Sequence, residues 1–454
     1  MIVEALTRVS AANSTWLEAD IAREIAALIP ADAVSGGDEL VRVVDQLASE
    51  AAQRCVALHP AASPSTARRQ DGTPVTEHVT DRRLTTAHVL DQEQRLQVWA
   101  SRSIGTVSDD GDSVVEAITG DDRLVLVVGP AGTGKTTALG RGVQQLRQTG
   151  RPVVGLAPSG KAADVLAGET GMPTGTLAKL LSEYSRGGGP SPTWHLSRGT
   201  TVIVDEAGMA STDDLAALVA LADSNGWRLV CVGDPDQLPA VGRGGMFAQW
   251  CETLPAYRLE EVRRFSQEWE GVASLALRRG DPAAAATYQA HRRVRVVHPA
   301  LVPRQVAGLH QQVAARRETL AITTASAATA RAINEEIQYQ RNRLRDGPAV
   351  ALADGTRAFT GDQLATRRND PSVVTDQGHS VKNRHTWTVT AVHRDGSLTV
   401  ATPTAAPSYF PPPTCPNTSN SDGPSPVTAA KGSLQTELSA SSSPQAAGRA
   451  STSA

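Results

Sequence analysis

The sequence predicts an α/β fold built on a parallel sheet, and two observations support this prediction. Between residues 124 and 234, short apolar runs alternate with stretches of helical periodicity. The runs are continuous in apolar character, as expected of strands that helices cover on both faces. They read LVLVV (124–128), PVVGLA (152–157), TVIVD (201–205) and RLVCVGD (228–234).

Composition restricts the class of protein. The chain has 454 residues, enough for two or three domains, and its net charge of −3 means that any nucleic-acid contact must come from local patches. Four cysteines lie far apart without a C-x-x-C pair, which predicts a reducing cytoplasm and no metal cluster. Neither a signal peptide nor an apolar run of about eighteen residues is present, so we expect no membrane contact.

Periodicity and composition divide the chain into five segments. Residues 1–100 predict a small helical domain, with a helix at 15–29 that Thr15 and Glu18 would start as a capping box. Residues 101–258 are expected to form the parallel sheet. Within 259–350 the sequence predicts a further strand at 319–325, followed by a helix. Residues 351–401 are β-rich, with a hairpin across HRDG, and 402–454 form a Ser/Thr/Pro/Ala-rich tail predicted to be disordered.

The first motif, GPAGTGKT (129–136), fits the phosphate-binding loop G-x-x-x-x-G-K-[ST], placed between a strand and a helix as that loop requires. Its glycines let the backbone curl so that N–H groups point at phosphates. We expect Lys135 to contact the β- and γ-phosphates and the Thr136 hydroxyl to bind Mg²⁺. A glycine-rich turn without a ligand is the weaker alternative. The expected nucleotide contacts are Gly129, Pro130, Ala131, Gly132, Thr133, Gly134, Lys135, Thr136 and Thr137.

The second motif, VIVDEAGM (202–209), places two carboxylates at the end of an apolar strand. The carboxyl edge of such a sheet is where ligands bind. We expect Asp205 to hold Mg²⁺ and Glu206 to act as the base that deprotonates an attacking water. A solvated strand end would be the simpler interpretation if the phosphate-binding loop did not precede it.

The third motif, VGDPDQLPAVG (232–242), follows another apolar strand. The amide of Gln237 is placed to contact the γ-phosphate and to report its loss. A plain Asp-Pro turn after a core strand is the alternative. The three motifs together predict ATP and Mg²⁺ as cofactors.

These segments resemble the RecD-like branch of superfamily-one helicases, and especially the helicase region of TraA/TraI-type conjugative relaxases. The resemblance rests on GPAGTGKTT, APSGKAA (157–163), VDEAGM and GDPDQLPAVGRGG, with weaker support from LEEVRRF (259–265) and from 366–400. It spans roughly residues 14–401. It implies a RecA-like P-loop domain at 101–258, a partial second RecA-like domain at 259–350 and an SH3-like insertion at 351–401.

The resemblance also implies ATP-driven translocation along single-stranded DNA. Arg264 would face the γ-phosphate, although an ion pair with Glu260 or Glu261 is the local alternative and Arg263 competes for the role. Residues near the DNA backbone would be Pro158, Ser159, Lys161, Thr174 and Thr176. For Lys161, a solvated helix position is an equally good interpretation.

Three departures from the family set limits. The glutamine that reads adenine is not evident: Gly111 stands near its place, and Gln92 and Gln94 lie further upstream. Nothing after residue 401 resembles motifs V and VI, and no relaxase signature precedes the motor. We therefore expect a region truncated at both ends, whose partners are single-stranded DNA and a relaxase or a polypeptide that completes the second motor domain.

Three functional hypotheses follow. The first is a DNA-translocating ATPase motor. The second is a nucleotide-binding remnant that lacks motifs V and VI and is inactive as a helicase alone. The third is an AAA-type ATPase that remodels proteins, against which the GDPDQLP segment argues.

Overall fold

The computed structural model describes most of the chain in two compact units, Met1–Val262 and the residues from Arg263 onward, each taken by itself below. The described residues are 1–30, 32–58, 82–105, 114–259, 261–262, 265–316, 318, 320–342, 347–352, 356–366, 370–374, 380–381, 385–401 and 408–410.

The first unit begins with a small helical module around a core of its own. Its elements are α1 (Ile2–Ala12), α2 (Glu18–Leu28), α3 (Gly37–Gln53) and the antiparallel pair β1 (Val56–Leu58) and β2 (Arg83–Thr85). The capping box expected at Thr15 and Glu18 is wrong. Trp16 exchanges backbone hydrogen bonds with Leu84 and stays extended, so the helix starts at Glu18, and the Asp20 carboxylate accepts the N–H of Leu17.

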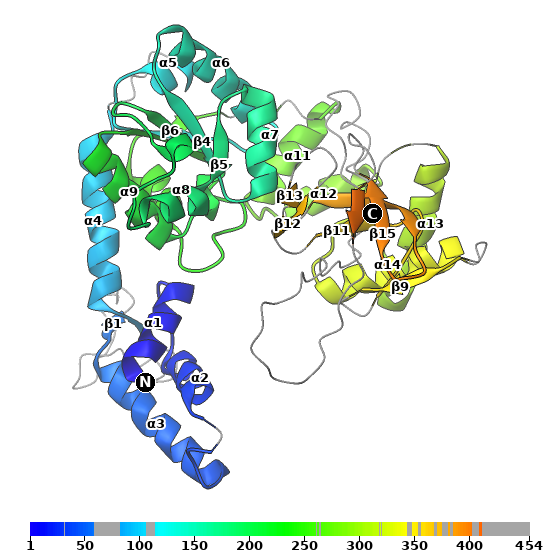
Figure 1. Ribbon diagram of the computed structural model, residues 1–454, viewed down its shortest axis with the longest axis horizontal. Helices are drawn as coiled ribbons and strands as arrows, with labels where there is room; N and C mark the ends of the chain where they lie inside the picture. Colours follow the sequence, from blue (N-terminus) through cyan, green and yellow to red (C-terminus); the bar gives the residue numbers. More distant parts are fainter. Residues whose placement is uncertain are drawn as a thin grey trace. The chain divides into compact units, whose positions relative to one another are not determined.

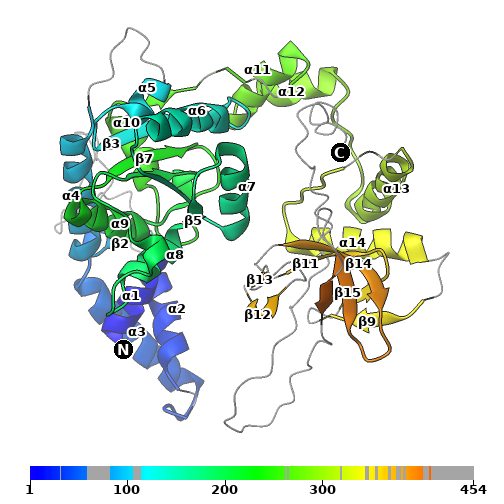
Figure 2. The ribbon, with the colours of Figure 1, turned by 45° about the horizontal axis from the view of Figure 1, so that its top comes forward.

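Helix α4 (Ala87–Ser103) belongs to two cores at once. Val89, in its first turn, packs with the helical module, whereas Leu96 and Ala100 pack beneath the sheet. Figures 1 and 2 show α4 running from the N-terminal helices to the sheet domain. A displacement of this helix would therefore be felt in both cores.

A six-stranded sheet in the order β5-β4-β6-β7-β3-β8 forms the centre of the first unit. All of its pairings are parallel, which confirms the predicted fold class. The four predicted apolar runs form its fully buried strands, and two short strands, β5 and β8, complete its edges. The strands are β3 (Leu124–Val128), β4 (Val153–Ala157), β5 (Thr174–Thr176), β6 (Thr201–Val204), β7 (Arg228–Gly233) and β8 (Tyr257–Arg258).

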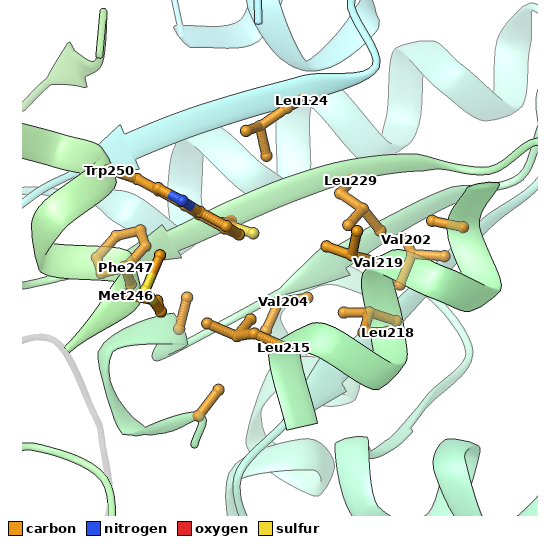
Figure 3. Packing of buried hydrophobic residues seen from close by; sticks show 14 of the residues in the cluster. Leu124, Val202, Val204, Leu215, Leu218, Val219, Leu229, Met246, Phe247 and Trp250 are labelled. Atoms are coloured by element: carbon orange, nitrogen blue, oxygen red, sulfur yellow. The ribbon is translucent and has the colours of Figure 1, made fainter. Parts of the chain in front are cut away.

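Helices cover both faces of the sheet, which explains why its strands are apolar on both sides. One face packs on α4, α8 (Leu177–Tyr184), α9 (Thr212–Asn225) and α10 (Met246–Thr253), where Trp250 and Phe247 lie among strand residues (Figure 3). The other face packs on α5 (Val114–Thr119), α6 (Lys135–Gln148) and α7 (Gly160–Thr170). Two short 3-10 helices, Pro192–Trp194 and Ala207–Met209, lie in connecting loops.

The second unit begins with helices α11 (Glu268–Arg278), α12 (Ala283–Ala290), α13 (Val302–Ala315) and α14 (Ala327–Asn342), with a 3-10 turn at Pro299–Leu301. The strand predicted at 319–325 is wrong: the described residues 320–325 form no strand. Leu320 is buried, and Ile322 packs on the core between α13 and α14, so the apolar residues of this segment pack near helices rather than in a sheet.

The rest of the second unit is β-rich, as predicted. An antiparallel sheet runs in the order β11-β14-β15-β16, and the hairpin across HRDG is confirmed by the pairing of Val392 with Leu398. Ser408–Phe410 pairs with β15, so this piece of the predicted tail belongs to the sheet. The rest of 402–454 lies outside the described residues. The strands are β9 (Ala349–Ala351), β10 (Arg357–Phe359), β11 (Gln363–Ala365), β12 (Asp370–Val374), β13 (Ser380–Val381), β14 (Thr386–Val392), β15 (Leu398–Ala401) and β16 (Ser408–Phe410).

Candidate nucleotide-binding site

The loop between β3 and α6 has the curled backbone that its sequence predicts. The buried Thr133 hydroxyl donates to the carbonyl of Pro130 at 2.9 Å, which closes the turn. Gly134 has φ 86°, a left-handed conformation that favours glycine, and directly precedes the first helical residue, Lys135. The N–H of Gly129 donates to the carbonyl of Gly233 at 3.1 Å, which ties the loop to the end of β7.

The ammonium group of Lys135 is the most telling feature of this loop. Its Nζ atom is buried and has no hydrogen-bond partner among the described residues. The nearest opposite charge is Oε1 of Glu206, 3.8 Å away, beyond hydrogen-bonding distance. A buried cation without hydrogen bonds is costly unless a ligand completes it. The geometry therefore fits an anionic group above the loop, such as a polyphosphate.

Asp205 follows the buried strand β6, and its N–H donates to Leu156 at 2.9 Å. Burial raises the pKa of this carboxyl to about 6, and the charge of Glu206 adds to the increase. The N–H of Glu206 and the charge of Lys135 act in the opposite direction. A carboxylate that is costly to ionise in isolation is suited to a bound cation, whose charge would favour the ionised form.

Glu206 has a strained backbone that its sequence did not predict. Its φ of 51° and ψ of 44° place it in the left-handed region, which costs a residue with a side chain roughly 1–2 kcal/mol. The N–H of Met209 donates to the carbonyl of Glu206 at 2.9 Å, and this hydrogen bond stabilises the turn. This conformation directs the carboxylate toward Lys135, so the strain serves the geometry of the site.

The third motif ends beside the first. Strand β7 lies between β3 and β6, so Asp234 and Gln237 are on the same sheet edge as the loop. The side chain of Asp234 is buried and accepts the N–H of Asp236 at 3.2 Å and the amide of Gln237 at 3.2 Å. The Gln237 side chain is thus held at its own turn rather than on Lys135.

The residues proposed for DNA contacts lie at the ends of neighbouring strands, β4 and β5. The Ser159 hydroxyl caps α7 by accepting the N–H of Ala162, and the Thr176 hydroxyl caps α8 in the same way. Thr174 donates its hydroxyl to the carbonyl of Ala163 at 2.8 Å. Pro158 is exposed and Lys161 is half-buried. A capping hydroxyl uses its acceptor, which leaves the O–H free to donate outward.

Four positions named from the sequence lie outside the described residues: Gly111, Glu260, Arg263 and Arg264. Gln92, considered as a substitute for the adenine-reading residue, is engaged at both ends of its amide. Its Nε2 donates to Asp213, and its Oε1 accepts from Arg243. It therefore stabilises the fold around α4 and cannot also read a base without breaking these bonds.

One acidic residue near the site carries no sequence signal. Glu169 lines a cavity of about 730 Å³ between α6 and α7, together with Thr136 and Thr137, and its charge contributes to the raised pKa of Asp205. Glu169 lies near the end of α7, far in the sequence from the acidic residues of the second and third motifs. Only the packing of α7 on α6 places it there.

Other classes of site find little support. Within the ranges the structure describes, no cluster of three or more histidine, cysteine or acidic side chains could hold a metal ion. Cys55, Cys231 and Cys251 are free thiols, and burial raises the pKa of the last two to about 12. No helix in the described residues has the length and apolar character to cross a membrane.

Comparison with known families agrees with this geometry. Residues 106–299 match the family described as "AAA domain". The chain is 32% identical over 276 residues to the conjugal transfer protein TraA of Rhizobium radiobacter, covering 59% of this chain and 24% of TraA. It is 32% identical over 171 residues to the multifunctional conjugation protein TraI of Escherichia coli K12, covering 35% of this chain and 10% of TraI. Over these residues the chain is similar to conjugal transfer proteins of the TraA/TraI type.

The chain is also similar to a protein that is named as a DNA helicase. The ATP-dependent RecD2 DNA helicase of Deinococcus radiodurans is 35% identical over 163 residues, which cover 35% of this chain and 22% of that protein. The chain thus spans about a quarter of the TraA relative and smaller shares of the others. Among solved structures, the Pif1 helicase from Candida albicans aligns with a TM-score of 0.41 and 18% identity over 64% of this chain and 70% of that one. The loop at 129–136 has the sequence pattern and the curled backbone of a phosphate-binding P-loop.

Proposed function

We propose that the chain binds Mg²⁺-ATP and couples its hydrolysis to movement along single-stranded DNA, as the motor part of a conjugative relaxase-helicase. The observation that carries the proposal is the buried Lys135 ammonium, which lacks a hydrogen-bond partner among the described residues and lies 3.8 Å from the Glu206 carboxylate. This arrangement combines a phosphate-binding cation with a proton acceptor in one site.

The residues of the site have separate tasks in this proposal. Lys135 and the loop N–H groups hold the β- and γ-phosphates. The Thr136 hydroxyl and the Asp205 carboxylate are oxygen donors of the kind that Mg²⁺ prefers, and the bound ion would neutralise phosphate charge. Glu206 accepts the proton of the attacking water, and Gln237 reports the loss of the γ-phosphate.

The DNA-contacting part of the proposal rests on the strand ends beside this site. The hydroxyls of Ser159 and Thr176 cap helices as acceptors, so their O–H groups can donate to backbone phosphates, next to Lys161. Such contacts position a strand without reading its sequence. A motor of this kind works where ATP and DNA meet, which implies the cytoplasm.

Two further roles complete the proposal. Arg264 supplies a positive charge to the γ-phosphate. A relaxase, or a polypeptide that completes the second motor domain, acts with this chain in conjugative transfer. The relatives named for conjugation motivate this second role.

The test is the rate of phosphate release from ATP by the whole chain, with and without single-stranded DNA, at low salt because phosphate contacts weaken steeply with ionic strength. We expect Mg²⁺-dependent turnover that DNA stimulates. Nucleotide binding without DNA-stimulated turnover would leave the remnant hypothesis standing and overturn the motor. Stimulation by unfolded protein but not by DNA would favour the protein-remodelling class.

A further inference from the structure

Arg243 is a buried arginine in the segment that joins the third motif to α10. It lies six residues beyond Gln237, and its side chain is only 3% exposed. Burying a guanidinium group is costly unless its charge and donors are paired. The partners of the Arg243 side chain therefore indicate which segments of the chain this residue connects.

The Arg243 side chain joins α4 to α9. Its Nη2 donates to Oε1 of Gln92 on α4 and, at 2.5 Å, to Oδ1 of Asp213 in the first turn of α9. Gln92 closes the triangle by donating its own amide to Asp213 at 3.0 Å. Glu93 on α4 lies 4.0 Å from Nη1. One arginine thus holds the start of α9 against the middle of α4.

The backbone of the same segment contacts the N-terminal module. The N–H of Arg243 donates to the carbonyl of Ala11 at 2.9 Å, and Ala11 lies at the end of α1. The carbonyl of Arg243 accepts the N–H of Thr212 at 2.8 Å. Gly242 has φ 108°, and a Cβ there would stand 3.1 Å from the Ala11 carbonyl oxygen. The close approach of the segment to α1 therefore requires glycine at this position.

The network is only partly satisfied. Nε and Nη1 of Arg243 are buried and have no hydrogen-bond partner among the residues that the structure describes. A buried polar network with spare donors is a less stable arrangement than a complete one.

Helix α4 extends this network in both directions. Its first turn packs in the core of the N-terminal module and its last turns pack beneath the sheet, so Gln92 and Glu93 lie at the junction of the two cores. Ser14, in the turn after α1, donates to Glu93 at 3.1 Å. Movement of the Arg243 segment would thus be transmitted to α1 and α4 together.

We infer that Arg243 is a positioning residue for the ATPase reaction: it anchors the end of the segment that follows Gln237, and it couples this segment to the N-terminal helical module. The inference rests on the proposed function, because it assigns Gln237 a part in sensing nucleotide. Arg243 acts through Gln237 and touches neither nucleotide nor DNA. Its loss reduces turnover while the P-loop still binds.

The experiment compares Arg243→Met with Arg123→Met in the whole chain. Met retains the apolar stem but removes the charge. Arg123 is a matched control, since it also contacts α4, with its guanidinium 5.9 Å from the Trp99 ring, and also pairs with a carboxylate of α9, Asp223. Its exposed pair is remote from the Gln237 segment. For Arg243→Met we expect kcat to fall by about 10²-fold, the cost of misplacing a reacting group by about 1 Å, with KM for ATP changed less than about twofold. Arg123→Met should leave both constants unchanged, and Arg243→Lys should recover part of the turnover.

A second readout depends on nucleotide binding alone. In the wild-type chain, a non-hydrolysable ATP analogue should change amide hydrogen exchange at residues 10–14 and in the first half of α4, and Arg243→Met should abolish this change while leaving the analogue bound. A purely structural role would lower stability but preserve the response. The inference is overturned if Arg243→Met matches Arg123→Met in kcat and keeps the exchange response. A wild-type chain that fails to bind nucleotide would instead overturn the proposed function, and the inference with it.

Discussion

The ammonium nitrogen of Lys135 and a carboxylate oxygen of Glu206 lie 3.8 Å apart, although seventy-one positions separate the two residues in the chain. The contact forms because strand β7 alone separates the strands that deliver them, β3 and β6, so both side chains reach the same sheet edge. Neither residue is satisfied by the other, since the distance exceeds that of a hydrogen bond. Both charged groups therefore keep hydrogen-bonding capacity that is not used between them.

Replacing Glu206 by Gln should separate binding from catalysis. The amide has the shape of the carboxylate but cannot accept a proton from water, so nucleotide affinity should stay within about threefold while turnover falls by about 10²–10⁴-fold, the usual contribution of a general base. Single-turnover hydrolysis and an equilibrium titration on the same preparation check this. Equal loss of both would show that Glu206 acts in binding.

The strained backbone of Glu206 makes a second prediction. Glu206→Gly and Glu206→Ala both remove the carboxylate, but only glycine accepts the φ of 51° without strain. The glycine variant should therefore be more stable than the alanine variant by about 1 kcal/mol, although alanine is ordinarily the more stabilising residue. Urea unfolding of the two variants measures the difference. A more stable alanine variant would contradict the left-handed conformation.

Gly175 on the edge strand β5 should tolerate no side chain while Trp194 is present. A Cβ at this position would stand 2.2 Å from Cη2 of the Trp194 ring. Gly175→Ala should lower the free energy of unfolding by about 1–3 kcal/mol, the usual cost of overpacking. In a Trp194→Leu background the same change should cost much less. A double-mutant cycle by chemical denaturation tests this, and additive effects would show that the ring does not cover the strand.

Acid should weaken the loop that follows α8 through Glu183. The side chain is 2% exposed and pairs with Lys179 at 2.6 Å, and this pair, the N–H of Ser191 and the charge of Arg186 lower its pKa from 4.5 to about 2. Because the folded pKa lies below the unfolded value, the stabilisation is complete above about pH 4.5 and is lost as the pH falls toward 2. Unfolding free energies measured from pH 6 downward should fall more steeply for wild type than for Glu183→Gln. Parallel curves would exclude this role.

The sheet and the motifs could be predicted from the sequence because both depend on local patterns of residues. Continuous apolar runs identified the four buried strands, and the spacing of glycine, Lys135 and Thr136 identified the loop. The rule that the carboxyl ends of parallel strands meet at one edge of the sheet then predicted that Asp205 lies near Lys135. These inferences need only nearest neighbours along the chain.

What the sequence could not predict depends on contacts between distant segments. The helix start at Glu18 depends on the pairing of Trp16 with Leu84, and the left-handed backbone of Glu206 depends on the turn that follows it. Glu169 lies in no motif, and nothing in the GDPDQLPAVGRGG segment indicates the partners of Arg243. Both follow only from the packing of α7 on α6 and of α9 on α4. The strand expected at 319–325 is wrong for the same reason, since apolar content alone does not provide a neighbouring strand.

The central claim is that the P-loop and the acidic strand end hold one magnesium–triphosphate between them. Titration of a fluorescent ATP analogue into wild type and Lys135→Ala, each with Mg²⁺ and with a chelator, tests it most directly. We predict saturable, Mg²⁺-dependent binding to wild type and a loss of affinity of at least about tenfold, or about 1.4 kcal/mol, in Lys135→Ala. Equal affinity of the two proteins, or binding that is indifferent to Mg²⁺, would contradict the account.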